Sequence, residues 1–432
     1  MRMLVQTLVL AISFSWAQAQ SNEPVHAPVS TLVKAGRLLD VRKGEYVENA
    51  AILVEGDRVK EAGPASQVEP HAPRDARVID LGRATVIPGL IDCHTHLMAR
   101  SSDSPDHYIL ALAKKSQAYR ALEGAADARA TLLAGFTAVR DVENEGSGYA
   151  DVALRDAINE GLVEGPRMQV ATRAIAAVGQ YNPFGVSPDL PDFPTGAQMV
   201  SGEEEARRAA REQIGQGADL IKIYADWTHP TLTVEEMTAI VEEAHKAGLK
   251  VAAHATTVDG IKNALKAGVD SIEHGHRADR QAIEIMKAKG VFLVPTVAVI
   301  DAQAKALGPG QLTPAQRTRF DAFVQGTFDE VATAKKLGVK IASGSDASSA
   351  EEHGRNATEL ASMVKRGLTP LEAIQAATIN AAELMSWQDR VGAVETGKFA
   401  DLIAVEGDPL LDITVLQSVK FVMKGGAVIR SN

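Results

Sequence analysis

Cysteine is almost absent from this chain of 432 residues, because Cys93 is the only one. A single cysteine excludes an intramolecular disulfide, even in an oxidising compartment. Positive charge is not in excess either, since Lys and Arg total 45 against 55 Asp and Glu, for a formal net charge of -10. A nucleic-acid-binding protein needs basic patches that contact phosphates, so this balance argues against that class. It does not exclude a small anionic ligand, because a local cleft need not follow the net charge.

Long apolar runs are missing after the first twenty residues. The N-terminus has a positive charge at Arg2, an apolar run over Leu4–Trp16, and small residues at Ala17 and Ala19. This pattern predicts a signal peptide over residues 1–19, cleaved after Ala19, and a mature protein that is secreted or periplasmic. An N-terminal membrane anchor is the alternative, although the run is short for a bilayer span. Since no second run follows, we expect no stable membrane insertion.

The two ends of the chain are rich in short strand patterns, whereas the middle alternates between strands and helices. Residues 30–86 and 391–430 therefore predict a small β-sandwich built from both chain ends, with residues 87–390 inserted into it. The strands expected in the middle are Val86–Cys93, Thr137–Asp141, Arg167–Arg173, Leu220–Tyr224, Lys250–His254, Ser271–His274, Val291–Val297 and Lys340–Ser345. Eight strand–helix units in series predict an α/β protein with a (β/α)8 TIM barrel. The alternative is a doubly wound open sheet, but no Gly-x-Gly-x-x-Gly turn follows the first strand.

Helix boundaries support this alternation. Thr233 and Glu236 have the spacing of a capping box at the start of a helix that ends near Gly248. Further helical patterns cover residues 202–217 and 279–290, and glycines stand where several helices are expected to end.

Side chains that can bind metal ions follow the expected barrel strands. In this fold, catalytic side chains stand at the C-terminal ends of strands. The residues found there are His94, His96, Lys222, His254, His274 and Asp346. Each has an alternative explanation without a metal ion. The two histidines of the first strand can be polar surface residues, and the lysine can extend from an apolar strand to solvent. The later histidines can be core residues, and the aspartate can cap a helix. Six such groups at the ends of five different strands nevertheless indicate a metal site.

The motifs around these residues resemble the amidohydrolase superfamily, and the resemblance runs from about Leu32 to Ile429. The matching segments are Pro88–His96, Ile221–Tyr224, Ala252–Ala255, Ile272–Gly275 and Gly344–Asp346. The resemblance implies two divalent metal ions, usually zinc. In that arrangement, the first ion is bound by His94, His96 and Asp346, and the second by His254 and His274. Lys222, carboxylated by carbon dioxide, would bridge both ions.

The chemistry explains why the lysine has to be modified. A free ammonium is a cation and cannot ligate a metal ion, whereas a carbamate offers two anionic oxygens. Two ions would lower the pKa of a shared water and polarise the substrate carbonyl. Asp346 is expected to move the proton from that water to the leaving nitrogen. Tyr224 lies on the same strand face as Lys222, where it either donates to the tetrahedral oxyanion or packs in the wall.

Two further residues are predicted to bind substrate. Arg140 ends the second barrel strand and can clamp a substrate carboxylate with its planar guanidinium, or else pair with Asp141. His353 lies on the loop after the eighth strand, and such loops often bind substrate in barrels.

Within the superfamily, the chain looks most like the branch of metal-dependent Xaa-Pro dipeptidases and carboxypeptidases, which includes ochratoxin A amidohydrolases. The implied substrate is a dipeptide or N-acyl amino acid, cleaved at the amide bond to its C-terminal amino acid. One alternative is an imidazolonepropionase-like cyclic amidohydrolase or a deaminase, which lack the bridging lysine. Another is a non-catalytic binding protein on the same fold, which should have lost ligands. Related enzymes often form homo-oligomers, and we expect the same here.

Overall fold

The computed structural model describes residues 30–100, 105–180, 187, 189, 193–308 and 310–431. The predicted signal peptide, residues 1–19, lies outside this part of the chain. Within it, the helices are all too short or too polar to span a lipid bilayer.

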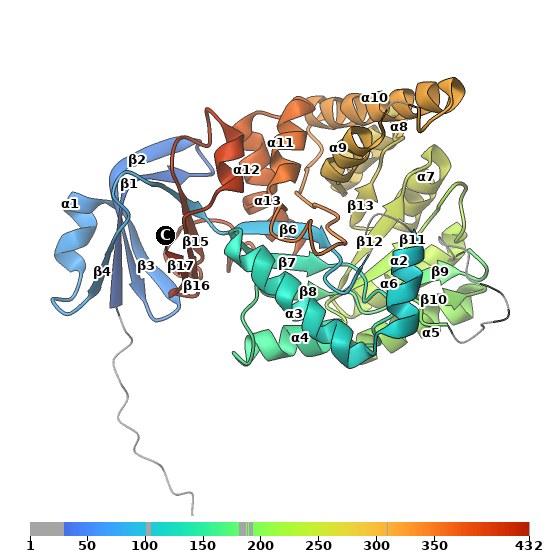
Figure 1. Cartoon of the computed structure of the whole chain (residues 1–432), viewed down its shortest axis with the longest axis horizontal. Coiled ribbons are helices and arrows are strands. Elements are labelled where there is room, and N and C mark those ends of the chain that lie inside the picture. The colour runs from blue at the N-terminus through green and yellow to red at the C-terminus, as the bar shows by residue number, and fades with distance from the viewer. Residues whose placement is uncertain are drawn as a thin grey trace, which may run out of the picture.

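Strands from both chain ends form one eight-stranded sheet, seen on the left of Figure 1. The strands are β1 (Ser30–Asp40), β2 (Glu45–Glu55), β3 (Arg58–Pro64), β4 (Arg77–Asp80), β5 (Thr85–Pro88), β15 (Leu402–Val405), β16 (Phe421–Lys424) and β17 (Ala427–Ser431). β5 pairs with β1 on one side and β15 on the other, so it joins the two ends of the chain. Apolar side chains from both halves, including Ile52 and Phe421, pack into one buried cluster. The unit predicted from both termini is therefore a continuous hydrogen-bonded sheet.

The chain passes from this sheet into the central unit at Gly89. β6 (Leu90–Thr95) follows at once, so the predicted strand Val86–Cys93 is in fact two strands in two different sheets. A Cβ at position 89 would lie 2.1 Å from the Thr137 hydroxyl, so only glycine allows this close passage.

The central unit contains parallel strands in the predicted order. β6, β7 (Phe136–Asp141) and β8 (Arg167–Val170) form one sheet. The other sheet contains β9 (Ala174–Ala177), β10 (Ala197–Val200), β11 (Leu220–Tyr224), β12 (Lys250–Ala255), β13 (Ser271–His274) and β14 (Phe292–Val294). The predicted third strand, Arg167–Arg173, ends early as β8, because the backbone turns at Thr172, whose φ is 61°, and β9 begins after the predicted end.

The predicted eighth strand is an extended segment, residues 340–347, that lies between β14 and β6. Ile341 forms a bridge to Leu293 of β14, and Ala347 forms a bridge to Thr95 of β6. The Cys93 amide also donates to the Ser343 carbonyl at 2.8 Å. The segment thus connects the two sheets in the position that the eighth strand of a TIM barrel takes.

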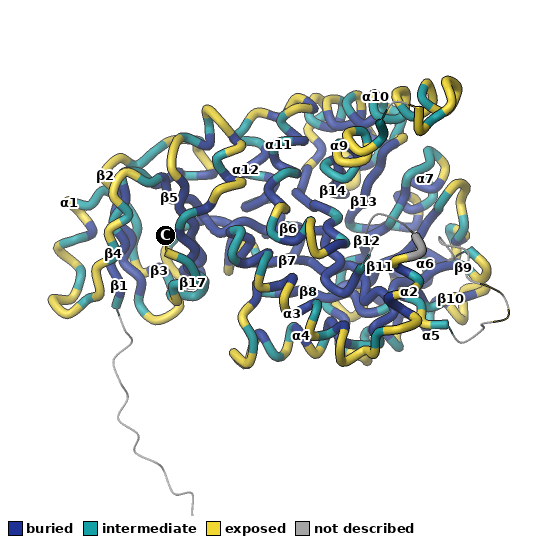
Figure 2. The backbone as a smooth tube through the Cα atoms, in the orientation of Figure 1, coloured by how far each residue is buried: buried dark blue, intermediate teal, exposed yellow. Residues whose placement is uncertain are grey.

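Helices alternate with these strands and cover them. They are α2 (Pro105–Lys114), α3 (Gln117–Leu133), α4 (Ala150–Asn159), α5 (Glu203–Gly215), α6 (Val234–Lys246), α7 (Val258–Ala267), α8 (Arg280–Lys289), α9 (Val297–Ala306), α10 (Pro314–Leu337), α11 (Thr358–Lys365), α12 (Pro370–Ala376) and α13 (Ile379–Leu384). Short helical turns α1 (Ala65–Val68), η1 (Glu69–His71) and η2 (Ile413–Gln417) belong to the terminal segments. The predicted capping box of Thr233 and Glu236 begins α6. Figure 2 shows the central strands buried and the outer helix surfaces exposed.

Candidate functional site

The carboxyl ends of the central strands surround a cavity of about 400 Å3. Its wall includes Tyr224 and every residue predicted to bind a metal ion, namely His94, His96, Lys222, His254, His274 and Asp346. The other lining residues are Ala99, Tyr108, Glu145, Trp227, Gln303 and Ser348. This volume is within the range of small-molecule sites.

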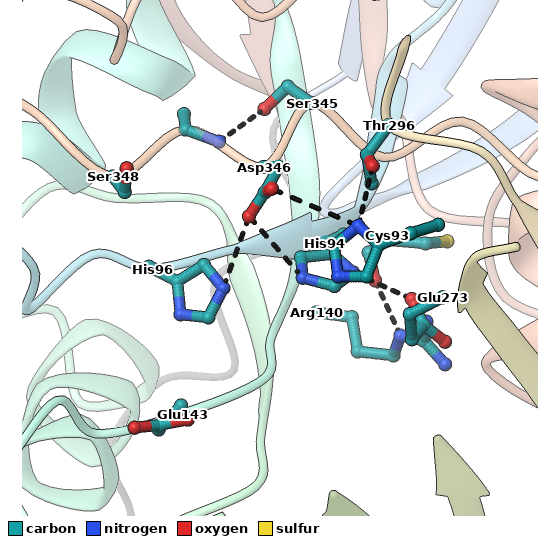
Figure 3. Close-up of polar contacts among 12 residues, drawn as sticks. Cys93, His94, His96, Arg140, Glu143, Glu273, Thr296, Ser345, Asp346 and Ser348 are labelled. Carbon is teal, nitrogen blue, oxygen red and sulfur yellow. Dashed lines mark hydrogen bonds and ion pairs between the residues drawn. The ribbon is translucent and has the colours of Figure 1, made fainter. Parts of the chain in front are cut away.

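Figure 3 shows His94 and His96 next to Asp346, and the rings of His254 and His274 lie beside this group. The ring centroid of His94 is 5.2 Å from that of His96 and 4.9 Å from that of His274. The His254 ring is 4.5 Å from the His274 ring. One carboxylate oxygen of Asp346 lies 3.5 Å from His94 Nε2 and 3.3 Å from His96 Nε2. Residues far apart in the sequence thus converge as the strand order predicts.

Three of these side chains form a group that can hold a metal ion. Ligand atoms of His94, His274 and Asp346 all lie within 4.8 Å of one another. The Nε2 atom of His94 is buried and accepts no hydrogen bond, although buried polar atoms are nearly always bonded. A metal ion would satisfy this nitrogen. The group combines residues that the family resemblance assigns to two different ions, which is consistent with two ions placed close together.

Two residues of this group have an unusual backbone. His274 has a φ of 70° and Asp346 a φ of 57°, in the left-handed region that non-glycine residues rarely adopt. Such a residue costs on the order of 1–3 kcal/mol, and the surrounding structure must hold it. The Asp346 amide donates to the His94 carbonyl at 2.8 Å, which connects the strained Asp346 backbone to a second member of the group.

Polar side chains behind the histidines orient their rings, and no sequence motif predicted them. Glu273 lies 2.7 Å from Nδ1 of His94, and Glu145 lies 2.7 Å from Nδ1 of His96. The Thr296 hydroxyl lies 2.7 Å from Nδ1 of His274. For His94, a carboxylate that accepts the Nδ1 proton leaves the Nε2 lone pair available to a metal ion, as in many metal sites.

The electrostatics of the cavity favour the ligand forms of His94 and Asp346. Burial lowers the pKa of His94 to about 4, and the nearby Lys222 charge acts in the same direction. Burial raises the pKa of Asp346, but the hydrogen bond from His96 and the neighbouring positive charges outweigh it and hold the pKa at about 2. A neutral imidazole and an ionised carboxylate are the forms that bind metal ions.

Lys222 is an isolated buried cation. Its side chain is on β11 and the residue is 1% exposed. Within the described part of the chain, no carboxylate forms an ion pair with its ammonium, and the ring of Tyr224 lies 5.6 Å away. Burial lowers the pKa of Lys222, although the charges of Glu273 and Glu143 oppose the effect. A buried ammonium without an ion pair is unfavourable, which shifts the equilibrium of Lys222 toward the neutral amine.

Tyr224 lies in the cavity wall as predicted, and its neighbours hold its ring in place. Its hydroxyl donates a short hydrogen bond to the Glu143 carboxylate. Its ring stacks on Trp227 at 4.6 Å and lies 5.1 Å from the His254 ring. These contacts keep the hydroxyl at the rim of the histidine group.

Arg140 does not line the cavity, so the predicted substrate clamp is corrected. The side chain is 2% exposed and points into the barrel interior. Its guanidinium donates to the Cys93 carbonyl at 2.6 Å, to Ser271 Oγ at 3.1 Å and to Glu273 Oε1 at 2.7 Å. The guanidinium donors therefore bind acceptors inside the protein. Arg140 holds the Glu273 carboxylate, which in turn orients the His94 ring.

His353 is also away from the cavity. The loop after residue 347 folds back onto α3, so that His353 is 5% exposed and its Nδ1 lies 3.5 Å from the Thr131 hydroxyl. Its other ring nitrogen is 3.9 Å from the Asp127 carboxylate. The prediction that this loop brings His353 to the substrate is therefore wrong. The sequence places His353 after the eighth strand but does not show which way the loop turns.

The buried pair of Arg140 and Glu273 yields a stability prediction. Glu273→Gln removes the charge that compensates a buried guanidinium, so we expect the free energy of unfolding to fall by about 3–5 kcal/mol. Urea denaturation of both proteins measures the change. Glu284→Gln is the matched control, because its partner Arg280 lies with it on an exposed helix face, and its effect should stay below about 1 kcal/mol. Equal effects of the two variants would refute the role of Glu273.

Comparison with known proteins gives consistent matches over nearly the whole chain. The model of the Amidohydrolase family matches residues 85–429. Ochratoxinase of Aspergillus niger is 32% identical to this chain, over 93% of this chain and 86% of its own sequence. The crystal structure of A. niger ochratoxinase superimposes with a TM-score of 0.83 at 30% identity and covers 94% of this chain and 96% of its own. A Xaa-Pro dipeptidase crystallised with methionine in its active site gives a TM-score of 0.82 at 33% identity, covering 92% and 99%. Imidazolonepropionase of Symbiobacterium thermophilum is 27% identical, over 87% and 91%.

Proposed function

The chain belongs to the amidohydrolase family, and from this premise we propose that it cleaves the amide bond to a C-terminal amino acid in dipeptides or N-acyl amino acids. A hydrolase of amide bonds is what the family and its relatives indicate. The preference for a C-terminal amino acid is supported by similarity to two proteins, one described as an ochratoxinase and the other as a Xaa-Pro dipeptidase.

The observation that carries the proposal is the convergence of four histidines, Asp346 and Lys222 on one cavity. We propose that these residues hold two divalent metal ions, with zinc as the first candidate because imidazole and carboxylate ligands suit it. Bound ions would supply Lewis acidity, which lowers the pKa of a water molecule and polarises the scissile carbonyl. The unbonded Nε2 of His94 and the close group of His94, His274 and Asp346 fit such ions.

Carboxylation of Lys222 would resolve its unfavourable burial. The neutral Nζ attacks the carbon of carbon dioxide, a nitrogen–carbon bond forms, one nitrogen-bound proton leaves, and a carbamate anion with two oxygens results. An isolated buried cation becomes an anion beside the proposed ions, where it can act as a bridging ligand. Burial of the side chain at 1% exposure also protects the product from exchange with bulk water.

The protein side chains have distinct tasks in the proposed reaction. Asp346 is ionised, and its Oδ1 lies within 3.5 Å of His94 Nε2 and His96 Nε2, so the carboxylate can accept a proton from the attacking water. The same carboxyl group then gives this proton to the nitrogen of the leaving amino acid. Tyr224 is proposed to turn its hydroxyl from Glu143 toward the carbonyl oxygen as negative charge develops there.

Loss of the Tyr224 hydroxyl provides a test of that role. Tyr224→Phe should lower kcat by roughly 10^2–10^3-fold with a small change in KM, because the lost hydrogen bond forms only as the oxyanion develops. Steady-state kinetics on the preferred substrate measures both constants. Trp227→Phe is the control, since it keeps an aromatic ring against Tyr224 and removes no oxyanion donor. An unchanged kcat in Tyr224→Phe would leave the residue with a packing role only.

The substrate class can be tested by a release assay. The mature, metal-loaded protein is incubated with a set of dipeptides and N-acyl amino acids, including an aryl amide such as ochratoxin A, and freed amino acids are identified by mass spectrometry. We expect release of one C-terminal class, lost on chelation and recovered when zinc is restored. Release of none of them by protein with two bound ions would overturn the proposed substrate class.

A cyclic amide is the second candidate substrate, because imidazolonepropionase is also similar over most of the chain. Lys222 argues against it, since the resemblance associates that reaction with a single ion and no bridging lysine. Ring opening of lactams and lactones is therefore the assay to run if no amino acid is released. Export guided by residues 1–19 and formation of a homo-oligomer stay predictions.

A further inference from the structure

A second cavity, of about 690 Å3, lies at the opposite mouth of the barrel from the histidine group. Its wall is formed where strands begin, by Arg167 at the start of β8, Leu220 at the start of β11 and Lys250 at the start of β12. The segment after α13, including Trp387 and Arg390, covers one side. Arg140, which was expected at the other mouth, reaches this cavity from the barrel interior.

Cations dominate the wall, and two of them have no acidic partner. Five of the lining residues are Arg or Lys, whereas two are acidic, Asp156 and Asp219. Both of these aspartates pair with Arg155 at 2.8 Å. Arg140 and Arg167 are likewise paired, with Glu273 and Asp401. The charges of the remaining two cations are not neutralised in this way.

Those two cations are Lys250 and Arg390. The ammonium of Lys250 donates to the backbone carbonyl of Glu383 at 3.0 Å and makes no ion pair within the described residues. The guanidinium of Arg390 lies 5.0 Å from the Trp387 ring and 5.5 Å from the Phe399 ring, again without an ion pair in the described chain. A half-buried lysine that lines the same cavity as a second unpaired cation is stabilised when an anion binds in that cavity.

The size and the remaining lining indicate what kind of anion fits. A cavity of 690 Å3 is far larger than an inorganic anion needs and is typical of a small organic ligand. Leu249, Leu384, Met385 and Trp387 supply apolar wall for the body of such a molecule. The cations supply partners for a carboxylate or phosphate group.

We propose that this cavity, which we call the amino-mouth cavity, binds a small organic anion through Lys250 and Arg390, with the apolar part of the ligand against Trp387. The shared ligand chemistry is an anionic oxygen group on a compact apolar body, whether an aryl carboxylate or a phosphate monoester. The site is separate from the histidine cavity and does not depend on the proposed hydrolysis.

Tryptophan fluorescence provides a local readout. The mature chain keeps Trp227 and Trp387, so the Trp227→Phe protein reports from Trp387 alone. This metal-loaded protein is titrated with phthalate, with phenyl phosphate and with uncharged benzamide. We expect saturable changes with at least one of the two anions and none with benzamide; the stronger binder identifies the carboxylate or the phosphate as the preferred group.

Charge-removing variants decide whether the signal comes from the amino-mouth cavity. Lys250→Met and Arg390→Met should each weaken anion binding about tenfold or more, whereas Lys43→Met, at an exposed lysine of the terminal sheet, should leave it unchanged. Thermal unfolding confirms that each variant is folded, and Arg390→Lys should bind more tightly than Arg390→Met. Binding that survives both Met variants but disappears on chelation belongs to the histidine cavity, and this result, or no binding of either anion, would overturn the proposal.

Discussion

Lys222→Ala should lower kcat/KM by roughly 10^4-fold or more and reduce the metal content of the purified protein from two ions to about one per chain. The variant removes the only group proposed to bridge both ions, and the remaining histidines and Asp346 are left to hold metal ions without that anion. Lys222→Arg should lower kcat/KM and metal content by similar amounts, because a guanidinium stays charged and does not form a carbamate. Metal analysis and steady-state kinetics on the same preparations measure both effects.

A control substitution at an exposed lysine and rescue by added acetate test this prediction further. Lys246→Ala removes a largely exposed lysine from α6 and should leave both kinetics and metal content unchanged. Truncation at position 222 also vacates buried space beside the proposed ions, so added acetate should restore part of the activity of Lys222→Ala by supplying two oxygens. Full activity with two ions in Lys222→Ala would show that the residue is only part of the wall.

Asp346→Asn should lower kcat by roughly 10^3–10^4-fold while substrate binding changes little. The amide has almost the same shape as the carboxylate but neither accepts the proton of the attacking water nor carries the negative charge that a metal ion favours. Kinetics at saturating substrate measures the loss of kcat, and metal analysis separates loss of proton transfer from loss of an ion.

The control for Asp346 is an exposed aspartate. Asp321→Asn lies on α10, where its carboxylate is 3.8 Å from Arg317, and should leave kcat within twofold of the original protein. If Asp346→Asn kept normal kcat with its metal content intact, another group would have to move the proton, and the role assigned to Asp346 would be wrong.

The strand order and the metal-binding residue types could be predicted because both follow simple rules. Parallel strands of a barrel end at one mouth, so residues such as His94 and His254 at strand ends must meet even though they are far apart in the sequence. The capping box at Thr233 was visible for the same reason, since its two residues are three positions apart and interact locally.

Other features depend on three-dimensional contacts that no local pattern reveals. Glu273 orients His94 although the two residues are 179 positions apart in the sequence. The sequence pattern indicated a role for His274 but none for Glu273. Arg140 has the right strand position for the cavity, but alternation along a strand shows which face a side chain takes and not which mouth of the barrel it serves. The first predicted strand divides between two sheets at Gly89, where the backbone passes too close to Thr137 of the next strand for any side chain to fit.

Native mass spectrometry of the mature, metal-loaded chain tests the central claim most directly. The account predicts two divalent ions per chain and one added carbon dioxide, which peptide mapping places on Lys222. Acidification should remove the ions and the carbon dioxide together, because the carbamate is held by the ions it bridges. A single ion with an unmodified Lys222 in fully active protein would contradict the binuclear centre.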